Sequence, residues 1–220
     1  MILKKLLITP YFGPFPEWMD LFLADFQRTL CPQGYKLLLD TDLPDFKRRV
    51  KEKLGVEYPG VRGNPKVWDY RCALGLLYEE EIKDYEYWGT ADFDMVWGNV
   101  SKFIPDSLLS ELDVYSGHNE YVCGCFSLYR NTPSVVDLFK SHVGWKAYML
   151  DPNPNGWVEE GFSRTLEQSR LRYKYDFQQG DPWTKNPVLQ KIDNDLYQII
   201  NKVWHPIMFF HFRHSKKWPL

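Results

Sequence analysis

The stretch YWGTADFDMVWGNV, residues 87–100, has the apolar and aromatic content of a buried strand, yet Asp92 and Asp94 stand inside it one residue apart. In an extended strand, residues i and i+2 project from the same face. We therefore expect both carboxylates to point together, with Phe93 turned the other way into the core. Burying a carboxylate costs several kcal/mol unless a cation pairs with it. The stretch thus predicts a positively charged partner at the end of this strand.

The residues before this stretch alternate between strand and helix patterns. Pro16 stands in the first turn of one helix pattern, and Gly55 closes another. The expected strands are 2–10, 35–41 and the start of the opening stretch, and the expected helices are 16–30, 45–55 and 66–82. This order is typical of an α/β layer with parallel strands.

The second half of the chain is less regular. Its patterns predict a strand at 121–131, a helix at 132–149, a loop at 151–156, a helix at 158–168 and short mixed strands to the end. No internal repeat or low-complexity linker separates the two halves. We therefore expect one α/β domain over residues 1–220, with a mixed, mostly parallel central sheet flanked by helices.

Composition limits the kinds of partner. The 220 residues are 44% hydrophobic, enough for a substantial core, and 17% aromatic; aromatic side chains fill cores but also line sites for sugars and nucleobases. A net charge of -2 gives no global positive field for nucleic acid. The start MILKKLLITP is neither a signal sequence nor a membrane anchor. Four cysteines without a C-x-x-C pair predict reduced thiols and a cytoplasmic location.

The two acids suit a metal ion. In open α/β sheets, ligands bind beyond the carboxyl ends of the strands, and two carboxylates there suit Mg²⁺ or Mn²⁺, which also take phosphate oxygens. The D-x-D pattern is weak by itself, and the alternative is that one Asp caps a turn while the other forms a surface ion pair. The aromatic flanks and the preceding strands and helices favour a metal, rather than an arginine, as the partner of Asp92 and Asp94.

The C-terminal stretch IMFFHFRHSKKW, residues 207–218, offers a third candidate ligand. His211 directly follows an apolar strand pattern, and Lys217 comes six residues later. An imidazole nitrogen is acceptable to Mn²⁺ and less so to Mg²⁺, and a lysine offers a point charge to a phosphate. The alternative for His211 is that it packs against the sheet.

Together these residues resemble the nucleotide-sugar-dependent glycosyltransferases of the GT-A fold. The likeness lies in ADFD at 91–94 after an α/β half, in CGC at 123–125 and in the ending HFRHSKKW. That ending is similar to the H-x-x-G-x-x-K-P-W ending of the glycogenin-like and bacterial galactosyltransferase families. It has His214 in place of the glycine and lacks the proline, which puts the backbone turn around the diphosphate in question.

A narrower likeness covers the first half of the chain. The stretches PYFGPFPEW, KVWDYRCALGLLY and YWGTADFDMVWGNV are similar to the amino-terminal domain of large algal-virus (chlorovirus) glycosyltransferases of capsid glycans. This likeness implies a viral protein in the host cytoplasm, further domains of a longer polypeptide, and L-rhamnose as one candidate for the sugar that is transferred.

The GT-A resemblance implies roles for the acids and for the tail. Asp92 would approach the ribose and the metal, and Asp94 would ligate the metal directly. His211 would complete the protein ligands, and Lys217 would hold the diphosphate. The implied cofactor is Mn²⁺ or Mg²⁺, and the implied donor is a UDP-sugar.

Further donor contacts follow from the same resemblance. The exit of the first strand would face the uracil and ribose through Thr9, Pro10, Tyr11 and Phe12. Arg71 matches a basic residue that reaches the diphosphate or the donor sugar, and Asp69 is a weaker candidate for that region. The alternative for Arg71 is a helix-surface ion pair with the acidic run at 79–81.

On the sugar side, Glu159 and Glu160 stand at a helix start where this fold carries an acid near the sugar or acceptor. One of them would act as general base in an inverting enzyme, or would position the sugar in a retaining one. The alternative is that both acids are there because a helix N-terminus favours negative charge. Gly124, between two small cysteines, would let the sugar approach its strand closely.

The expected function is transfer of a hexose or deoxyhexose, of glucose, galactose or rhamnose type, from a UDP-sugar to a glycan or glycoprotein acceptor. The tail likeness favours retention of configuration. Residues 1–100 would form the nucleotide-binding half, and 101–220 the sugar and acceptor half, with no membrane span. The alternatives are a metal-dependent phosphoester hydrolase, which usually holds two metals, and a non-catalytic carbohydrate-binding domain of the same fold.

Overall fold

The computed structural model describes residues 2–63, 65–181, 183–184 and 187–212. Its centre is a six-stranded sheet of order β2-β1-β3-β6-β5-β7, in which β6 runs opposite to β3 and β5. The other pairings of this sheet are parallel, which confirms the expected mixed, mostly parallel α/β sheet. Its strands are β1 (Lys5–Pro10), β2 (Tyr35–Asp40), β3 (Tyr87–Ala91), β5 (Val114–Ser116), β6 (Phe126–Arg130) and β7 (Tyr173–Tyr175).

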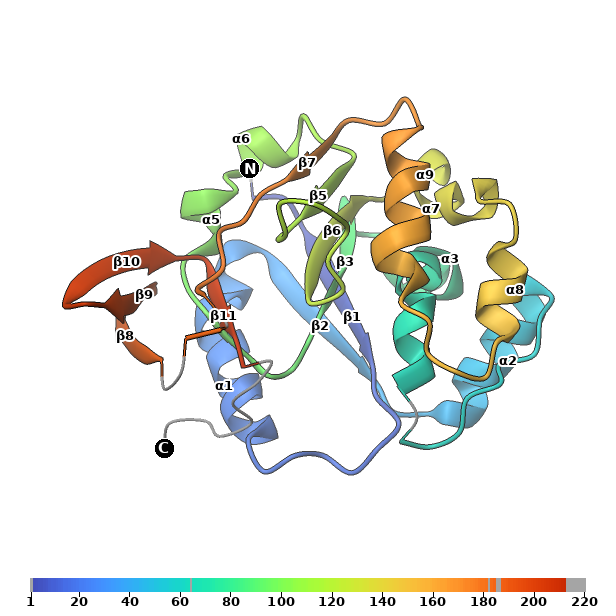
Figure 1. Ribbon diagram of the computed structural model, residues 1–220, viewed down its shortest axis with the longest axis horizontal. Coiled ribbons are helices and arrows are strands. Elements are labelled where there is room, and N and C mark those ends of the chain that lie inside the picture. Colours follow the sequence, from blue (N-terminus) through green and yellow to red (C-terminus); the bar gives the residue numbers. More distant parts are fainter. Residues whose placement is uncertain (1, 64, 182, 185–186, 213–220) are drawn as a thin grey trace.

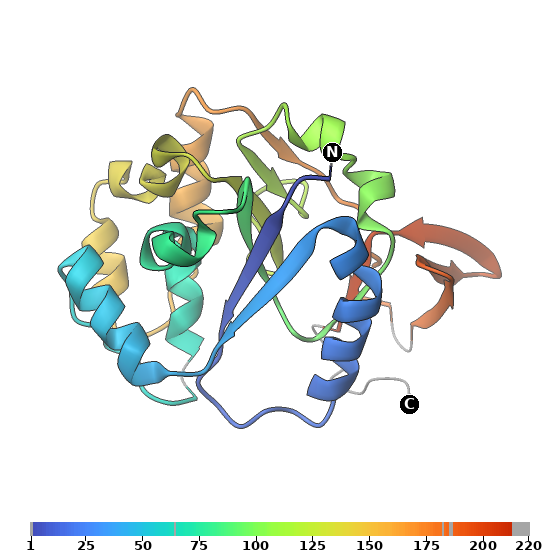
Figure 2. The same cartoon turned by 180° about the vertical axis from the view of Figure 1, so that it is seen from behind.

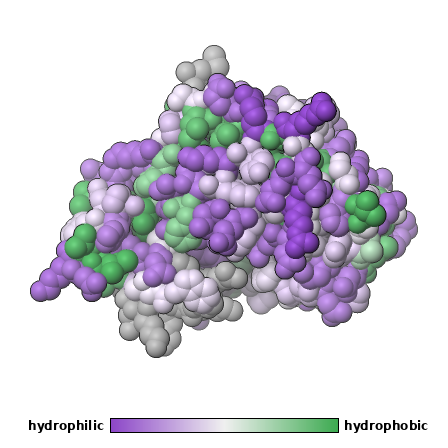
Figure 3. Space-filling view, turned by 45° about the horizontal axis from the view of Figure 1, so that its top comes forward, coloured by the Kyte–Doolittle hydropathy of each residue, from purple (hydrophilic) through white to green (hydrophobic). Residues whose placement is uncertain are grey.

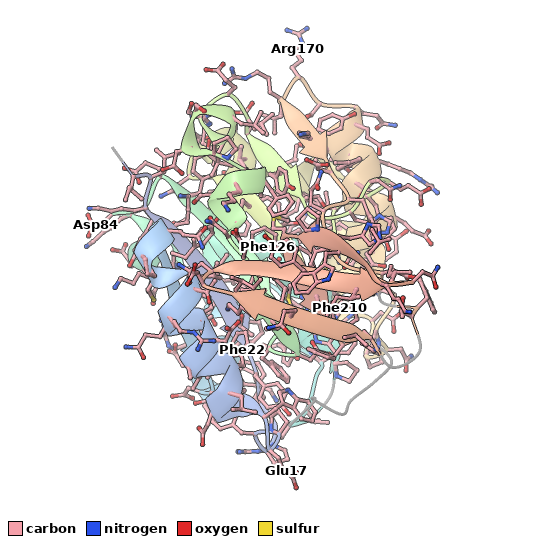
Figure 4. The ribbon with its side chains drawn as sticks, turned by 90° about the vertical axis from the view of Figure 1, so that its left-hand side faces the viewer. Glu17, Phe22, Asp84, Phe126, Arg170 and Phe210 are labelled. Atoms are coloured by element: carbon pink, nitrogen blue, oxygen red, sulfur yellow. The ribbon has the colours of Figure 1, made fainter. Side chains whose placement is uncertain are left out.

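Helices cover both faces of the sheet. In Figures 1 and 2, α1 (Met19–Thr29) lies on one side of β1 and β2, and α2 (Leu43–Leu54) and α3 (Leu74–Leu77) lie on the other. Successive residues of β1 alternate accordingly: Leu6 and Ile8 join the core with α2, α3, α7 (Pro133–Val136) and α9 (Ser163–Glu167). Leu7 joins the core with α1 and α6 (Asp106–Leu109). Figure 4 shows Phe22 and Phe126 inside the molecule, whereas Asp84 and Arg170 project at its periphery.

The two long helices have clear local causes. In α1, Met19, Phe22 and Phe26 are buried at helical spacing. In α2, the side chain of Asp42 caps the N-terminus by accepting a 3.0 Å hydrogen bond from the backbone N–H of Asp45. Gly55, in the left-handed conformation at φ 65°, ends the helix.

Two expected helices are broken in the structure. Residues 66–82 form a 3₁₀ helix, η2 (Pro65–Ala73), followed by the short α3 and by α4 (Glu79–Ile82). Residues 132–149 form α7, η3 (Leu138–Ser141) and α8 (Trp145–Leu150). The second break lies at Gly144, whose φ of 93° falls outside the right-handed helical region.

The opening stretch is also interrupted. Its first part is β3, but the strand ends at Ala91, Asp92 has no regular structure, and Phe93 and Asp94 form a bend. The chain then enters β4 (Met95–Trp97), which pairs antiparallel with β11 (Phe209–His211) in a separate two-stranded sheet. The prediction of one extended strand through both acids is therefore wrong. Phe93 is half-buried and packs against the core cluster that contains Phe22 and Phe126.

The remaining elements surround this framework. The expected strand 121–131 is shorter, because only β6 is regular there. Residues 188–207 form a three-stranded antiparallel sheet that lies to one side of the main body (Figure 1), with strands β8 (Val188–Ile192), β9 (Asp195–Ile200) and β10 (Val203–Ile207). Lys191 of β8 reaches the buried Asp25 of α1 at 2.5 Å. The other short helices are η1 (Cys31–Gln33), α5 (Val100–Phe103) and η4 (Val158–Phe162).

On the face seen in Figure 3, apolar side chains occur in small groups separated by polar ones. Within the part of the chain that the structure describes, no helix combines the length and the apolar character needed to span a bilayer.

Candidate active site

One edge of the central sheet gathers the candidate residues. Because β6 is reversed, its start lies at the same edge as the ends of β1, β3, β5 and β7. Along this edge, the residues next to the strands are Tyr11, Asp92, Cys125, Gly117 and Asp176, in the order of the strands across the sheet. A cavity of about 560 Å³ opens here and is lined from both halves of the chain.

Three predicted ligands meet in this cavity. His211 Nε2 lies 3.1 Å from Asp94 Oδ1 and 3.5 Å from Asp92 Oδ2, and one ligand atom of each residue lies within 4.8 Å of the others. The cause is the register of β4 with β11, which pairs His211 with Met95. In addition, the backbone N–H of Phe212 donates to the carbonyl of Asp94 at 2.9 Å. Two residues more than 110 positions apart are thus held side by side.

The electrostatics of this cluster favour charge on both partners. Burial disfavours the carboxylate form of Asp94, but the hydrogen bond and charge of His211 outweigh it and hold the pKa of Asp94 below its ordinary value. Burial likewise disfavours a charged His211, yet the hydrogen bond to Asp94 and the charge of Asp92 raise the pKa of its imidazole. Two carboxylate oxygens and one imidazole nitrogen form a donor set that fits Mn²⁺ and, less well, Mg²⁺.

Asp92 also has an arginine partner. Arg71, at the end of η2, forms an ion pair with Asp92. The alternative that Arg71 pairs with the acidic run at 79–81 is wrong, because two of those acids contact Arg49 and Lys53 of α2. The expectation of a metal instead of an arginine is therefore incomplete: in this structure Asp92 contacts a guanidinium and lies next to the imidazole.

Gly124 provides the room for this arginine. A Cβ built on Gly124 would overlap Arg71 Nη1 and would lie 3.1 Å from its Cζ and 3.3 Å from its Cδ. The missing side chain at Gly124 thus accommodates the guanidinium, whereas the sequence suggested room for a sugar. The neighbouring Cys123 and Cys125 are buried, line the cavity and hold their sulfur atoms 2.7 Å apart.

Asp69 lies in a buried polar cluster and does not line the cavity. Its carboxylate contacts Lys66 Nζ at 3.0 Å and accepts from the backbone N–H groups of Asn155 and Gly156 at 3.1 and 3.0 Å. Its backbone carbonyl accepts from the indole N–H of Trp157 at 2.7 Å. Asp69 therefore fixes the loop 151–156 and the start of η4, next to which Glu159 stands.

The other candidates divide between the cavity and the core. Of the four residues at the exit of β1, Tyr11 lines the cavity. Thr9 is buried and donates to the carbonyl of Ala91 at 2.8 Å, and Phe12 is buried against Phe46. Pro10 is the last residue of β1, is half-buried and is not among the lining residues.

On the sugar side, Glu159 lines the cavity, whereas Glu160 is exposed outside it. Both stand in η4, a π-helical turn of the kind often found at functional sites. Lys217 and His214 lie outside the described residues, so the predicted diphosphate contact has no structural counterpart to compare.

Most of the aromatic lining was not predicted. Tyr11 and Phe93 meet edge to face at 4.6 Å between ring centroids. Beyond this pair, the cavity walls include Trp18, Trp68, His118, Tyr121, Phe177 and Trp183. These residues come from loops and from η2, and their spacing in the sequence gives no sign that they converge; the aromatic content was the only hint.

The chain is similar to known proteins in its family profile and in its structure. No curated protein matches the sequence. The structure is similar to a solved structure described as that of a glycosyltransferase involved in the glycosylation of the major capsid of PBCV-1, with 14% sequence identity, a TM-score of 0.49, and coverage of 95% of this chain and 96% of the other. The profile of a family of unknown function, DUF6625, matches residues 7–204. The chain therefore belongs to the family DUF6625.

Proposed function

We propose that this chain is a metal-dependent glycosyltransferase of GT-A type, which transfers a hexose or deoxyhexose from a UDP-sugar to a glycan acceptor. The observation that carries the proposal is the group formed by Asp92, Asp94 and His211 at the carboxyl end of β3, inside a cavity of about 560 Å³. In open α/β sheets, nucleotides bind beyond the carboxyl ends of the strands, where the strand order reverses. Here it reverses at β1, with β2 on one side and β3 on the other.

The three ligands would hold Mn²⁺ or Mg²⁺, which when bound supplies Lewis-acid stabilisation to the departing diphosphate. Tyr11 and Phe93 would offer ring faces to the uracil at the β1 side of the cluster. Arg71, whose guanidinium is fixed beside Asp92, would place a second positive charge near the diphosphate. Lys217 stays a predicted diphosphate contact.

On the opposite side, Glu159 lines the cavity and is the residue that we assign to the sugar or acceptor hydroxyl. As a carboxylate it would accept the acceptor proton in an inverting reaction, or would stabilise positive charge on the sugar in a retaining one. The likeness of the tail to retaining families favours retention. A glycan or glycoprotein acceptor and a cytoplasmic location belong to the same proposal.

The hydrolase alternative needs more ligands than this site offers. Two-metal phosphoesterases hold their ions with several carboxylates and histidines. Within the described ranges, the only group of three or more candidate ligands is Asp92, Asp94 and His211. This favours the transferase over the hydrolase.

The test is binding of UDP with and without Mn²⁺. A ligand present at a hundredfold excess over its Kd stabilises the native state by about 2.7 kcal/mol, which raises the Tm of a chain of this size by roughly 5–11 °C. We expect such a rise with UDP and Mn²⁺ together, and none after Asp94→Asn. Asp84→Asn, an exposed carboxylate far out on the surface (Figure 4), is the matched control and should keep the rise. Equal stabilisation by UDP in the presence of a chelator would refute metal-dependent binding.

A further inference from the structure

The cavity extends past the metal cluster in the direction away from Tyr11. Its lining runs from Tyr11, after β1, to Phe177, after β7. Counting along the strand order, β3 carries Asp92, β6 follows with Cys125, and β5 and β7 come next. Neighbouring strands lie about 4.8 Å apart, so the ends of β5 and β7 are roughly 10 and 14 Å from the end of β3. A nucleotide bound at β1 and β3 leaves this region empty.

Aromatic rings line this far part of the cavity. The rings of His118 and Tyr121 stack at 3.8 Å with an interplanar angle of 20°. Phe177, just after β7, meets His118 edge to face at 6.0 Å. Trp183 lines the same cavity. We call these four residues the aromatic wall.

The segments that carry the aromatic wall are tied to the framework. Ser116 Oγ donates to the carbonyl of Tyr121 at 2.7 Å and accepts from the N–H of Cys123 at 2.8 Å, which closes the turn after β5. The segment after Phe177 is held to β11, because the backbone N–H of Gly180 donates to the carbonyl of Phe209 at 2.9 Å. β11 also carries His211. The aromatic wall and the metal ligands therefore belong to one fixed unit.

The chemistry of the aromatic wall selects a class of ligand. Phe177 and Trp183 keep 43% and 68% of their surface exposed, so part of the aromatic wall is accessible from solvent. Polar groups stand among the rings, including Gln179 and Glu159, which also line the cavity. A pyranose ring matches this mixture, because its C–H faces cover aromatic rings while its hydroxyls hydrogen-bond to polar groups.

Charge and position further narrow the choice. Among the described residues that line the cavity, Arg71 is the only lysine or arginine, and it is held at Asp92. None of the four residues of the aromatic wall is a lysine or an arginine. The donor sugar, attached to a diphosphate at the metal cluster, would lie over the start of β6, which leaves the ends of β5 and β7 for the second substrate.

We propose that the aromatic wall formed by His118, Tyr121, Phe177 and Trp183 is the acceptor subsite, and that it binds a pyranose ring of a glycan. This rests on the proposed function, because it assigns the second substrate of the same reaction. A sugar acceptor is the occupant to which this assignment commits, and binding of another class of molecule is an outcome of the test.

The experiment is saturation-transfer NMR with a panel of methyl pyranosides of glucose, galactose, mannose, xylose and rhamnose, added to the chain with UDP and Mn²⁺. At least one glycoside should receive saturation at its ring C–H protons. Phe177→Ala should weaken that binding by roughly three- to tenfold, the loss expected for one aromatic contact. Trp204→Ala removes an exposed tryptophan of the separate β8–β10 sheet and is the matched control, with unchanged binding.

The outcomes separate this proposal from the proposed function. UDP and Mn²⁺ should bind Phe177→Ala as they bind the native chain, since Phe177 lies on the far side of the metal cluster. If UDP and Mn²⁺ bind but no glycoside does, or if Phe177→Ala binds the glycoside unchanged, the acceptor subsite is refuted while the transferase stands. Saturation of a serine- or threonine-containing peptide in place of the glycosides also refutes it. Glycoside binding that depends on Phe177 without any UDP binding supports the sugar subsite and refutes the transferase.

Discussion

Gly124→Ala should destabilise the chain through one specific overlap. The backbone of Gly124 does not have a positive φ, so alanine can adopt its conformation without backbone strain. The added Cβ would nevertheless overlap Arg71 Nη1 and stand 3.1 Å from Arg71 Cζ. Real Cβ atoms rarely come this close to their neighbours, so the guanidinium must leave its place. The perturbation therefore removes the ion pair between Arg71 and Asp92 without touching either residue.

The size of the effect follows from the burial of that pair. Arg71 and Asp92 are only 16% and 22% exposed, so solvent screens their interaction weakly, and a charged hydrogen bond contributes about 1.5–3 kcal/mol. Replacing glycine by alanine restricts the unfolded chain and offsets about 0.4–1 kcal/mol of the loss. We expect Gly124→Ala to lower the free energy of unfolding by about 1–2 kcal/mol, a balance of these two contributions.

A double-mutant cycle by chemical denaturation tests this cause. In an Arg71→Ala background the Cβ added at position 124 meets no guanidinium, so Gly124→Ala should become neutral or slightly stabilising. The coupling free energy between the two substitutions should then be about 1 kcal/mol or more. Additive effects, with the same loss in both backgrounds, would show that Gly124 does not serve to accommodate Arg71.

Three further predictions concern the cavity and its support. Glu159→Gln should lower kcat by about a hundredfold or more if the carboxylate accepts the proton of the acceptor hydroxyl. Glu160→Gln is the control and should keep a kcat near that of the native chain. Equal kcat values for the two variants would exclude Glu159 as the general base. Asp69→Ala should lower the unfolding free energy by about 3–5 kcal/mol, because it strands the buried charge of Lys66, and urea denaturation measures it. In the presence of a chelator, the contact of Asp94 with His211 should stabilise the folded chain most between pH 3.8 and pH 6.5, the ordinary pKa values of the two groups. Because the pKa of His211 is raised in the folded state, its contribution to the free energy of unfolding is complete below pH 6.5 and is lost as pH rises through the raised pKa. Because the pKa of Asp94 is lowered in the folded state, its contribution is complete above pH 3.8 and is lost as pH falls through the lowered pKa. The stability difference between the native chain and His211→Asn should therefore shrink as pH rises above 6.5 and through the raised pKa of His211, and a difference independent of pH would contradict this.

The layout of the first half could be predicted because its periodicities are local. The helix patterns at 16–30 and 45–55 and the strand patterns at 2–10 and 35–41 correspond to α1, α2, β1 and β2. The pattern at 66–82 was misleading because two of the polar residues at its start do not face solvent. Lys66 and Asp69 are both buried, and Gly75 stands where a Cβ would be 2.5 Å from the ring of Trp88. Such tertiary contacts override helical propensity and leave no periodic trace.

The candidate site could be predicted only in its residue types. Asp92, Asp94 and His211 are recognisable as possible ligands, but their meeting depends on the pairing of β4 with β11, and β-strand register between distant segments is not written in either segment alone. The ion pair of Arg71 with Asp92 was also missed. It depends on the space that the absent side chain of Gly124 leaves for the guanidinium, and Gly124 is far from both residues in the sequence. The aromatic wall comes from loops, whose paths are set by the scaffold rather than by a local pattern.

The question raised by the two acids now has a physical answer. Within the described part of the chain, two carboxylates stand against one guanidinium and one imidazole of raised pKa, so below that pKa the charges of the half-buried acids are balanced without any metal. A divalent ion added alone would displace the His211 proton, because a ligating imidazole must be neutral, and would leave the site with excess positive charge. A diphosphate bound to the metal would remove that excess, and Arg71, which lies beside Asp92, would add a positive charge next to the diphosphate. Under the proposed function, these charges favour a metal that binds together with an anionic nucleotide over a metal that binds by itself.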